Sequence, residues 1–272
     1  MPNKYNMTVE DNIFLAKRNL VDSIWKEANI EGIGVTFPDT KEIFEGRTVP
    51  GLTVDETVAI NNLKHGWQFV LDTLDAPVDL AYVRQVNGVV GAGIIAQPGE
   101  LRCFDVGIGG TSWKPEIPDF DSAKAMIAEI SALDPGQDRA LLMFAALCRA
   151  QLFSDGNKRT AQLVANKMLI GDGAGILAIP VEHKARFEGL LIDYYESNDP
   201  ARFLSFVADV GVDGIDVPRP AESGQQASKS KGLTSRQDAR PGKGPDAALG
   251  NASRSAASRS ARQPLDGPRD RR

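Results

Sequence analysis

The sequence predicts a mainly α-helical protein with a short β-hairpin and a disordered C-terminal tail. Apolar residues recur at helical spacing through most of residues 8–209, and this period is the primary signal for amphipathic helices. The stretch 91–113 breaks the period with glycine and β-branched residues around a Pro98-Gly99 turn, which favours a hairpin. From about residue 217 no aromatic residue occurs, and Ser, Ala, Gly, Pro, Arg and Lys dominate. Such a segment buries too little apolar area to offset the entropy cost of ordering.

Two capping sequences mark the starts of the first long helices. Thr8 begins a Thr-Val-Glu-Asp sequence, and apolar residues at three-, four- and seven-residue steps follow it towards Gly32. This pattern predicts one amphipathic helix of about 20 residues. Thr53 begins a similar Thr-Val-Asp-Glu sequence, which predicts a second helix that ends before Pro77.

The chain continues the helical period up to about residue 212. The run 140–148 is apolar on every side, which indicates a helix that is buried on most faces. The sequence thus predicts one helical domain followed by a tail. The other helices are expected at residues 79–88, 121–132, 136–150, 157–170, 182–196 and 200–209.

The charge of the 272-residue chain is divided unevenly. From Val217 to the end there are 12 Lys and Arg against 5 Asp and Glu, a net charge of +7. The rest of the chain carries −12, because the whole has a formal charge of −5. The acidic body and the basic tail therefore point to different roles. Two interpretations of the tail stay open: a solubilising extension, or a weak electrostatic contact with nucleic acid or another acidic surface.

The sequence contains no signal for a membrane or for export. Its N-terminus lacks the apolar core of a signal peptide, and no apolar run reaches the roughly 18 residues that a membrane helix needs. Cys103 and Cys148 have no metal-ligand spacing and make no disulfide framework. We therefore expect a soluble, cytoplasmic protein that does not bind a membrane.

The segment 151–159, with the sequence QLFSDGNKR, carries the residues suited to chemistry. It precedes a helix that begins near Gly156, so unpaired backbone N–H groups and the positive end of the helix dipole meet there. Lys158 and Arg159 add positive charge, which suits a polyphosphate. The carboxylate of Asp155 suits a Mg²⁺ ion that bridges phosphate oxygens. The alternative is a capped helix with solvated surface charges.

The same segment resembles the motif of the Fic family, His-x-Phe-x-(Asp/Glu)-(Gly/Ala)-Asn-(Gly/Lys)-Arg. Phe153 and the run from Asp155 to Arg159 match this motif, whereas Gln151 takes the place of the histidine. The continuation KRTA is most similar to the Doc-like branch of the family. The resemblance extends over about residues 10–210 and implies a Fic-type helical bundle with a short β-hairpin flap.

Two further segments resemble parts of that family. The Asn-Ile-Glu-Gly sequence ending at Gly32 resembles the inhibitory motif of one Fic class, so Glu31 is a candidate for a glutamate that blocks the γ-phosphate site; an ordinary helix-end glutamate is the other interpretation. The resemblance implies an N-terminal helix and extension with this motif (1–50), a Fic domain (51–212) and a disordered basic tail (213–272). A glycine-rich segment resembles the flap that positions a target segment by strand pairing, and its residues are Gly107, Ile108, Gly109 and Gly110.

The resemblance also implies cofactors, partners and residue roles. Family members usually transfer AMP from ATP to a Ser, Thr or Tyr hydroxyl of a protein, so ATP, Mg²⁺ and a protein substrate are expected. Members with this N-terminal arrangement often form homodimers, although the sequence leaves the oligomeric state open. Asp155 would bind Mg²⁺, and Arg159 would clamp the β- and γ-phosphates. The implied catalytic residues are Gln151 (at the position of the usual histidine), Asp155, Asn157 and Arg159, and the implied nucleotide-binding residues are Gly156, Asn157, Lys158, Arg159 and Gln162.

Gln151 puts catalysis in question. The family's histidine accepts the proton of the target hydroxyl, and an amide cannot do this. In addition, Gln162 stands where many members have a second arginine, and Glu27 stands where the inhibitory motif favours Ser or Thr. Three hypotheses follow: a protein adenylyltransferase with impaired or altered catalysis, a non-catalytic Fic-fold module that binds a nucleotide or a partner protein, and an enzyme that transfers phosphate or removes AMP.

Overall fold

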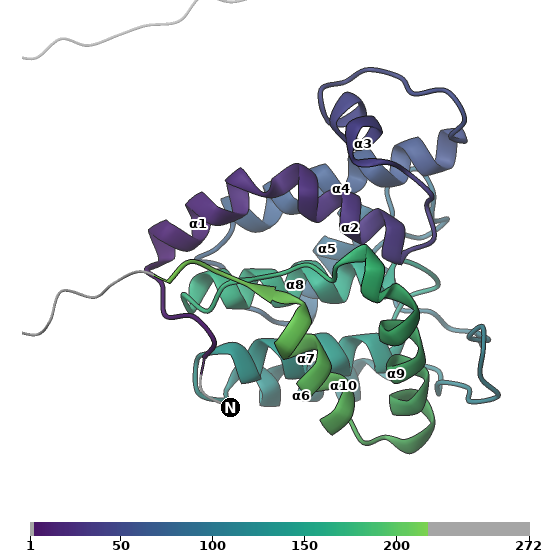
Figure 1. The fold of residues 1–272 in the computed structure, drawn as a ribbon. Helices are drawn as coiled ribbons and strands as arrows, with labels where there is room; N and C mark the ends of the chain where they lie inside the picture. Colours follow the sequence, from purple (N-terminus) through teal and green to yellow (C-terminus); the bar gives the residue numbers. More distant parts are fainter. Residues whose placement is uncertain (1–2, 217–272) are drawn as a thin grey trace, which may run out of the picture. The chain divides into compact units, whose positions relative to one another are not determined.

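The computed structural model describes residues 3–216, and these residues are mainly helical (Figure 1). The predicted fold class is therefore confirmed. The predicted disordered tail (213–272) begins too early, because Asp213 lies in a β-strand; from residue 217 onward the tail lies outside the described residues. In the described part no helix is both long and apolar enough to cross a membrane. The elements are α1 (Val9–Arg18), α2 (Leu20–Ile30), α3 (Phe37–Phe44), α4 (Val54–Asp72), α5 (Leu80–Val90), α6 (Phe120–Ser131), α7 (Gln137–Ala150), α8 (Asn157–Gly171), β1 (Ile176–Leu177), the 3-10 turn η1 (Val181–His183), α9 (Lys184–Ser197), α10 (Ala201–Val210) and β2 (Val212–Asp213).

Helices α7 and α8 form the centre of this arrangement and pack against each other (Figure 1). Helix α8 also contacts α1, α4 and α5. All residues of α8 except Lys158 and Gly171 are buried. The predicted buried run is confirmed as well, because α7 buries most of its side chains from Ala140 to Cys148. The start of α8 is therefore a fixed point in the fold.

Buried polar side chains hold α8 in position along its length. The Nζ atom of Lys167 donates to the carbonyl oxygens of Thr73 and Leu74, at 2.6 and 2.9 Å, and so caps the last turn of α4. The Asn166 amide bonds both the N–H and the carbonyl of Leu177 in β1. Since buried polar groups are costly unless bonded, these contacts allow one placement of α8.

Both predicted N-caps are present, but the first helix is not continuous. Thr8 accepts a hydrogen bond from the backbone of Asp11, and Thr53 forms the full reciprocal capping box with Glu56. The predicted 20-residue helix is divided at Asn19, which leaves α-helical geometry with φ −96° and ψ 10°. Asparagine is a weak helix former because its side chain competes for backbone hydrogen bonds. The apolar stripe therefore continues on α2 rather than along one helix.

The expected hairpin over residues 91–113 is absent, so this prediction is wrong. In the described chain, residues 91–119 contain turns and irregular backbone without a strand. The paired strands are β1 and β2, which are antiparallel with Ile176 opposite Asp213. A strand needs a hydrogen-bonding partner, and here the segment between residues 103 and 118 has no backbone–backbone hydrogen bond within the described part of the chain. Its glycines permit this open path, which side-chain contacts hold in place.

Candidate functional site

Two left-handed residues shape the loop between α7 and α8. Gln151 has φ 46° and Gly156 has φ 75°, so the chain reverses tightly at both ends of the loop. Between them, the Asn157 side chain accepts a hydrogen bond from the N–H of Phe153 at 2.9 Å and donates to its carbonyl at 2.8 Å. The Phe153 ring is buried, as expected of a core anchor. The first residue of α8 thus fixes the loop that precedes it.

Asn87 of α5 also holds this loop in place, a role that no sequence pattern indicates. Its amide nitrogen donates to the carbonyl of Asp155 at 3.0 Å and to the Thr160 hydroxyl at 3.2 Å. Its amide oxygen accepts from the N–H of Gly99 at 2.8 Å. A buried asparagine therefore joins α5, the Pro98-Gly99 turn and the start of α8.

We expect the substitution Gly156→Ala to destabilise the protein by about 2 kcal/mol, because a left-handed residue with a Cβ costs roughly 1–2 kcal/mol. The added Cβ would also lie 3.2 Å from the amide nitrogen of Asn87 and 3.4 Å from Val90. Urea unfolding measures this difference. Gly171→Ala on the same helix is the matched control, because nothing lies within 4 Å of its Cβ position and alanine is the better helix former. Equal stabilities of the two variants would contradict the assigned backbone strain.

A cavity of about 550 Å³ opens in front of this loop. It brings together three segments that are far apart in the sequence, namely the loop and start of α8, the glycine-rich segment 106–110, and Glu31 at the end of α2; α9 provides the remaining wall. Its lining residues are Glu31, Val106, Gly107, Ile108, Gly109, Gly110, Gln151, Ser154, Asp155, Asn157, Lys158, Glu188, Leu191, Ile192 and Tyr195. Every predicted flap residue therefore faces this cavity.

A carboxylate forms ion pairs with the positively charged side chains at the start of α8. The Nζ atom of Lys158 lies 3.5 Å from one oxygen of Glu31, and Nε of Arg159 lies 3.4 Å from the other. A terminal nitrogen of Arg159 lies 3.2 Å from the carboxylate of Asp155. The first N–H groups of a helix have no acceptor within the helix, so the backbone there also favours an anion. Glu31 thus places negative charge at a site built for anions.

The amide of Gln151 is bonded within the chain. Its nitrogen donates to the carbonyl of Cys148 at 2.7 Å and approaches the hydroxyl of Tyr195 at 3.5 Å, and its oxygen accepts from Asn157 at 3.2 Å. Gln151 therefore caps the C-terminal end of α7 with its own side chain. Burial raises the pKa of Tyr195 well above its usual value, so this phenol stays protonated and does not replace the missing base.

The remaining polar candidates lie away from the cavity. Gln162 is buried, and its amide donates to the carbonyl of Leu177 at 3.3 Å; it is not among the lining residues. His65 is exposed on α4, and His183 packs its ring against Phe206 at 6.0 Å. No histidine lines the cavity within the described residues.

Glu27 is a buried carboxyl group directly behind the site. Only 2% of the residue is exposed, and neither carboxyl oxygen has a hydrogen-bond partner in residues 3–216. Burial and the charge of Glu31 raise the pKa of Glu27 well above its usual value, and Trp67 and Arg159 oppose this increase. The environment therefore favours the protonated form of this carboxyl group, because ionisation without a partner would be costly.

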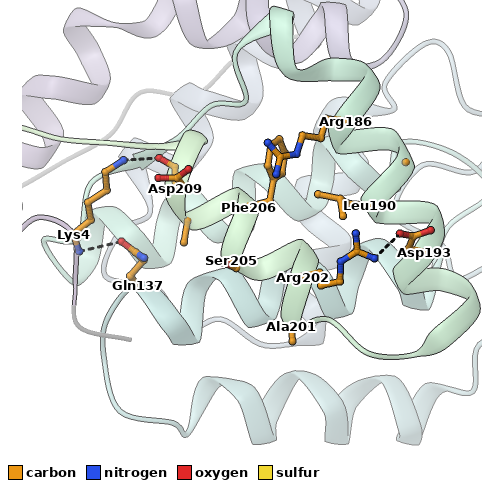
Figure 2. Close-up of a pocket in the computed structure, with 12 residues that line it drawn as sticks. Lys4, Gln137, Arg186, Leu190, Asp193, Ala201, Arg202, Ser205, Phe206 and Asp209 are labelled. Atoms are coloured by element: carbon orange, nitrogen blue, oxygen red, sulfur yellow. Dashed lines mark hydrogen bonds and ion pairs between the residues drawn. The ribbon is translucent and has the colours of Figure 1, made fainter.

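A second, larger cavity of about 1140 Å³ lies between α9 and α10 (Figure 2). Its charges are largely satisfied by the chain itself: Lys4 donates to the carbonyl of Asp209 at 2.7 Å, and Arg202 pairs with Asp193 at 3.2 Å. None of the predicted site residues lines it. The smaller cavity at the start of α8 is therefore the better candidate for the functional site.

Comparison with known proteins gives matches both in sequence and in structure. No protein-family model matches the chain. Among curated proteins, the chain is similar to protein adenylyltransferase Fic of Drosophila erecta, with 26% identity over 211 residues, and to that of Aedes aegypti, with 25% over 207 residues. These matches cover 71% of this chain and 41% and 40% of the two relatives. The chain thus spans about 40% of the length of the curated relatives it matches.

Solved structures share the fold. Fic-1 from C. elegans matches with a TM-score of 0.64 and 21% identity, over 72% of this chain and 62% of that one. A Fic domain containing signaling protein from Bacteroides thetaiotaomicron matches with a TM-score of 0.61 and 19% identity, over 77% of this chain and 87% of that one. The helices around the α7–α8 junction therefore form a Fic-type fold. The chain thus shares the Fic-type fold and is similar in sequence to Fic protein adenylyltransferases.

Proposed function

We propose that this chain binds ATP at the α7–α8 junction and is a protein adenylyltransferase whose catalysis is impaired by Gln151. One observation carries the proposal: Lys158 at the start of α8 and Glu31 line one cavity, and the carboxylate of Glu31 pairs as an anion with Lys158 and with Arg159, which is buried behind the lining. The curated relatives named protein adenylyltransferase support the same reaction class.

The phosphates of ATP would replace Glu31 at the start of α8. Backbone N–H groups of the first turn and the two cationic side chains, Lys158 and Arg159, would hold them. Mg²⁺ commonly uses one or two protein carboxylates together with substrate phosphates. Asp155 fits this pattern, because it lines the cavity and its side chain is 66% exposed. The described residues contain no cluster of three or more metal-binding side chains, which suits an ion that arrives with the nucleotide and neutralises phosphate charge.

The transfer step would join a target hydroxyl oxygen to the α-phosphorus of ATP. The bond to the β-phosphate oxygen would break, pyrophosphate would leave, and the hydroxyl proton would have to move to an acceptor. The segment 107–110 would position the target, because its unpaired backbone groups are free to pair with an extended peptide. Gln151 offers no basic group for the proton, which would slow the step by about 10²–10⁴-fold.

A second candidate function has its own support. Because the Gln151 amide caps α7 and bonds Asn157, glutamine has a structural role at this position. A Fic-fold module that binds a nucleotide or a partner protein without turnover is consistent with that role. Transfer of AMP by the natural chain would exclude this alternative.

We expect Glu31→Gly to tighten Mg-ATP binding about tenfold, or roughly 1.4 kcal/mol, because it removes a carboxylate that competes with phosphate. Arg159→Ala and Asp155→Ala should each weaken binding. Calorimetry with Mg-ATP measures all three. Glu45→Gly is the matched control, since Glu45 likewise ends a helix, α3, but lies outside the cavity. If no variant bound millimolar nucleotide, the nucleotide site would be refuted and a partner-binding scaffold would be left.

A further inference from the structure

Arg102 connects the loop between α7 and α8 to residues on both sides of the glycine-rich segment 106–110. Its Nε donates to the carbonyl of Gln151 at 2.7 Å, and its backbone N–H donates to the carbonyl of Leu152 at 3.0 Å. One terminal nitrogen donates to Phe104 at 2.7 Å, and the other donates to Glu116 and contacts Pro115 at 3.4 Å. One side chain thus joins the position of the usual catalytic histidine to residues 104 and 115–116.

The charge of Arg102 is unusual for its surroundings. The residue is only 3% exposed, and no carboxylate within the described part of the chain forms an ion pair with it at salt-bridge distance. Burial lowers the pKa of Arg102, and the charge of Asp105 opposes this; arginine nevertheless stays charged in proteins. A buried charge without an ion pair is costly. The carbonyl oxygens that accept hydrogen bonds from the planar guanidinium group must therefore keep their positions.

The segment between these two ends has few other attachments. It has no backbone–backbone hydrogen bond from residue 103 to 118 in the part of the chain that the structure describes. Its remaining contacts include the Thr111 hydroxyl, which donates to Glu196 at 2.6 Å, and Trp113, which stacks on Tyr195 at 5.2 Å. Arg102 is therefore the contact that fixes the ends of this segment relative to Gln151. From here on, residues 104–116, which include the predicted flap residues 107–110, are called the flap.

We propose that Arg102 is a positioning residue that sets the placement of the flap over Gln151. This role rests on the proposed transfer reaction, in which the flap would carry the target hydroxyl and the loop would carry the phosphates. Displacement of reacting groups by about 1 Å can cost 10²-fold in rate. Lysine cannot replace Arg102, because a single ammonium group cannot reach acceptors on three sides at once.

The experiment uses the full chain with a spin label on Cys103, which is exposed beside Arg102, whereas Cys148 is buried. Arg102→Lys and Arg102→Gln should increase the mobility of the label. In a Gln151→His background, they should lower the incorporation of AMP into the chain itself by about 10²-fold. Mg-ATP affinity should change less than twofold, because Arg102 does not touch Lys158, Arg159 or Glu31. Pro115→Gly keeps Arg102 but alters the backbone of a residue that Arg102 contacts. This variant should likewise increase the mobility of the label and lower the incorporation of AMP.

Arg139 provides the matched control. It too bonds backbone carbonyls, those of Ser131 and Leu133, and it pairs with Asp172 far from the cavity. Arg139→Lys should lower stability without changing label mobility, transfer or Mg-ATP affinity. Unchanged label mobility in both Arg102 variants would overturn the proposal, and so would a parallel loss of ATP affinity and stability in the Arg102 and Arg139 variants. Failure of the parent chain to bind Mg-ATP would instead refute the proposed function, while label mobility would still decide the placement of the flap.

Discussion

Gln151→His is expected to raise AMP transfer by about 10²–10⁴-fold, which is the usual contribution of a general base. Histidine titrates near neutral pH and accepts a proton, whereas the glutamine amide does not. The residue already lies at the edge of the cavity beside Asn157, at hydrogen-bonding distance. The measurement is incorporation of labelled AMP from ATP into the chain itself and into added protein substrates, followed by intact-mass analysis.

The double variants Gln151→His/Arg159→Ala and Gln151→His/Asp155→Asn serve as controls. Both should lose the gained activity, since they remove a phosphate contact or the proposed Mg²⁺ ligand without altering the base. If Gln151→His bound Mg-ATP and stayed inactive, the adenylyltransferase proposal would be refuted in favour of the non-catalytic module. Equal rates in the natural chain and the variant would show that another group accepts the proton.

The same substitution should have a cost in stability. An imidazole is shorter and more rigid than the glutamine side chain, so it cannot reproduce the 2.7 Å bond to the Cys148 carbonyl and the bond from Asn157 together. Loss of a helix C-cap contact exposes carbonyl groups that then need other partners. Glutamine at this position thus favours a rigid loop, and histidine would favour proton transfer.

Local patterns predicted the helices well because each one depends on nearby residues. The capping box at Thr53 and the apolar run of α7 are properties of short segments, and the structure has both. The break at Asn19 was missed, since the apolar stripe continues past it and only packing against neighbouring helices decides the direction of α2. The hairpin prediction failed for a related reason: β-branched residues and glycines favour a strand, but a strand forms only with a partner.

The residues of the candidate site that lie in one sequence motif could be predicted, whereas the residues that hold this motif in place could not. The segment 151–159 carries a phosphate-binding pattern in consecutive residues. Asn87 and Arg102, by contrast, act on that segment through backbone carbonyls 68 and 49 residues away. A carbonyl oxygen is present in every residue and leaves no mark in a sequence, so such contacts become visible only in three dimensions. The environment of Glu27 is likewise invisible in the sequence, because Trp67 of α4 and Arg159 of α8 act on it from distant parts of the chain.

We expect Glu27→Gln to stabilise the protein increasingly as the pH rises. The folded-state pKa of Glu27 lies well above 4.5, so above pH 4.5 the folded state retains a proton that the unfolded state has lost. The wild type therefore loses up to about 1.4 kcal/mol of stability per pH unit between pH 4.5 and the folded-state pKa. Glutamine is neutral and of similar size, so the variant avoids this loss. The two proteins should have similar stabilities near pH 4 and diverge above it.

Urea unfolding of the wild type and the variants from about pH 2 to pH 9 tests this expectation. Other titrating groups are common to the two chains and cancel in the difference, so the slope belongs to Glu27. Glu56→Gln is a control of opposite sign: hydrogen bonds from Thr53 lower the pKa of Glu56, so its stabilisation is present above pH 4.5 and is lost as the pH falls through the folded-state pKa. Parallel wild-type and Glu27→Gln curves would mean that Glu27 is ionised in the folded protein and pairs with Arg159. The arginine would then be neutralised from behind, and the affinity of the cavity for phosphate would have to come from Lys158 and the helix N-terminus alone.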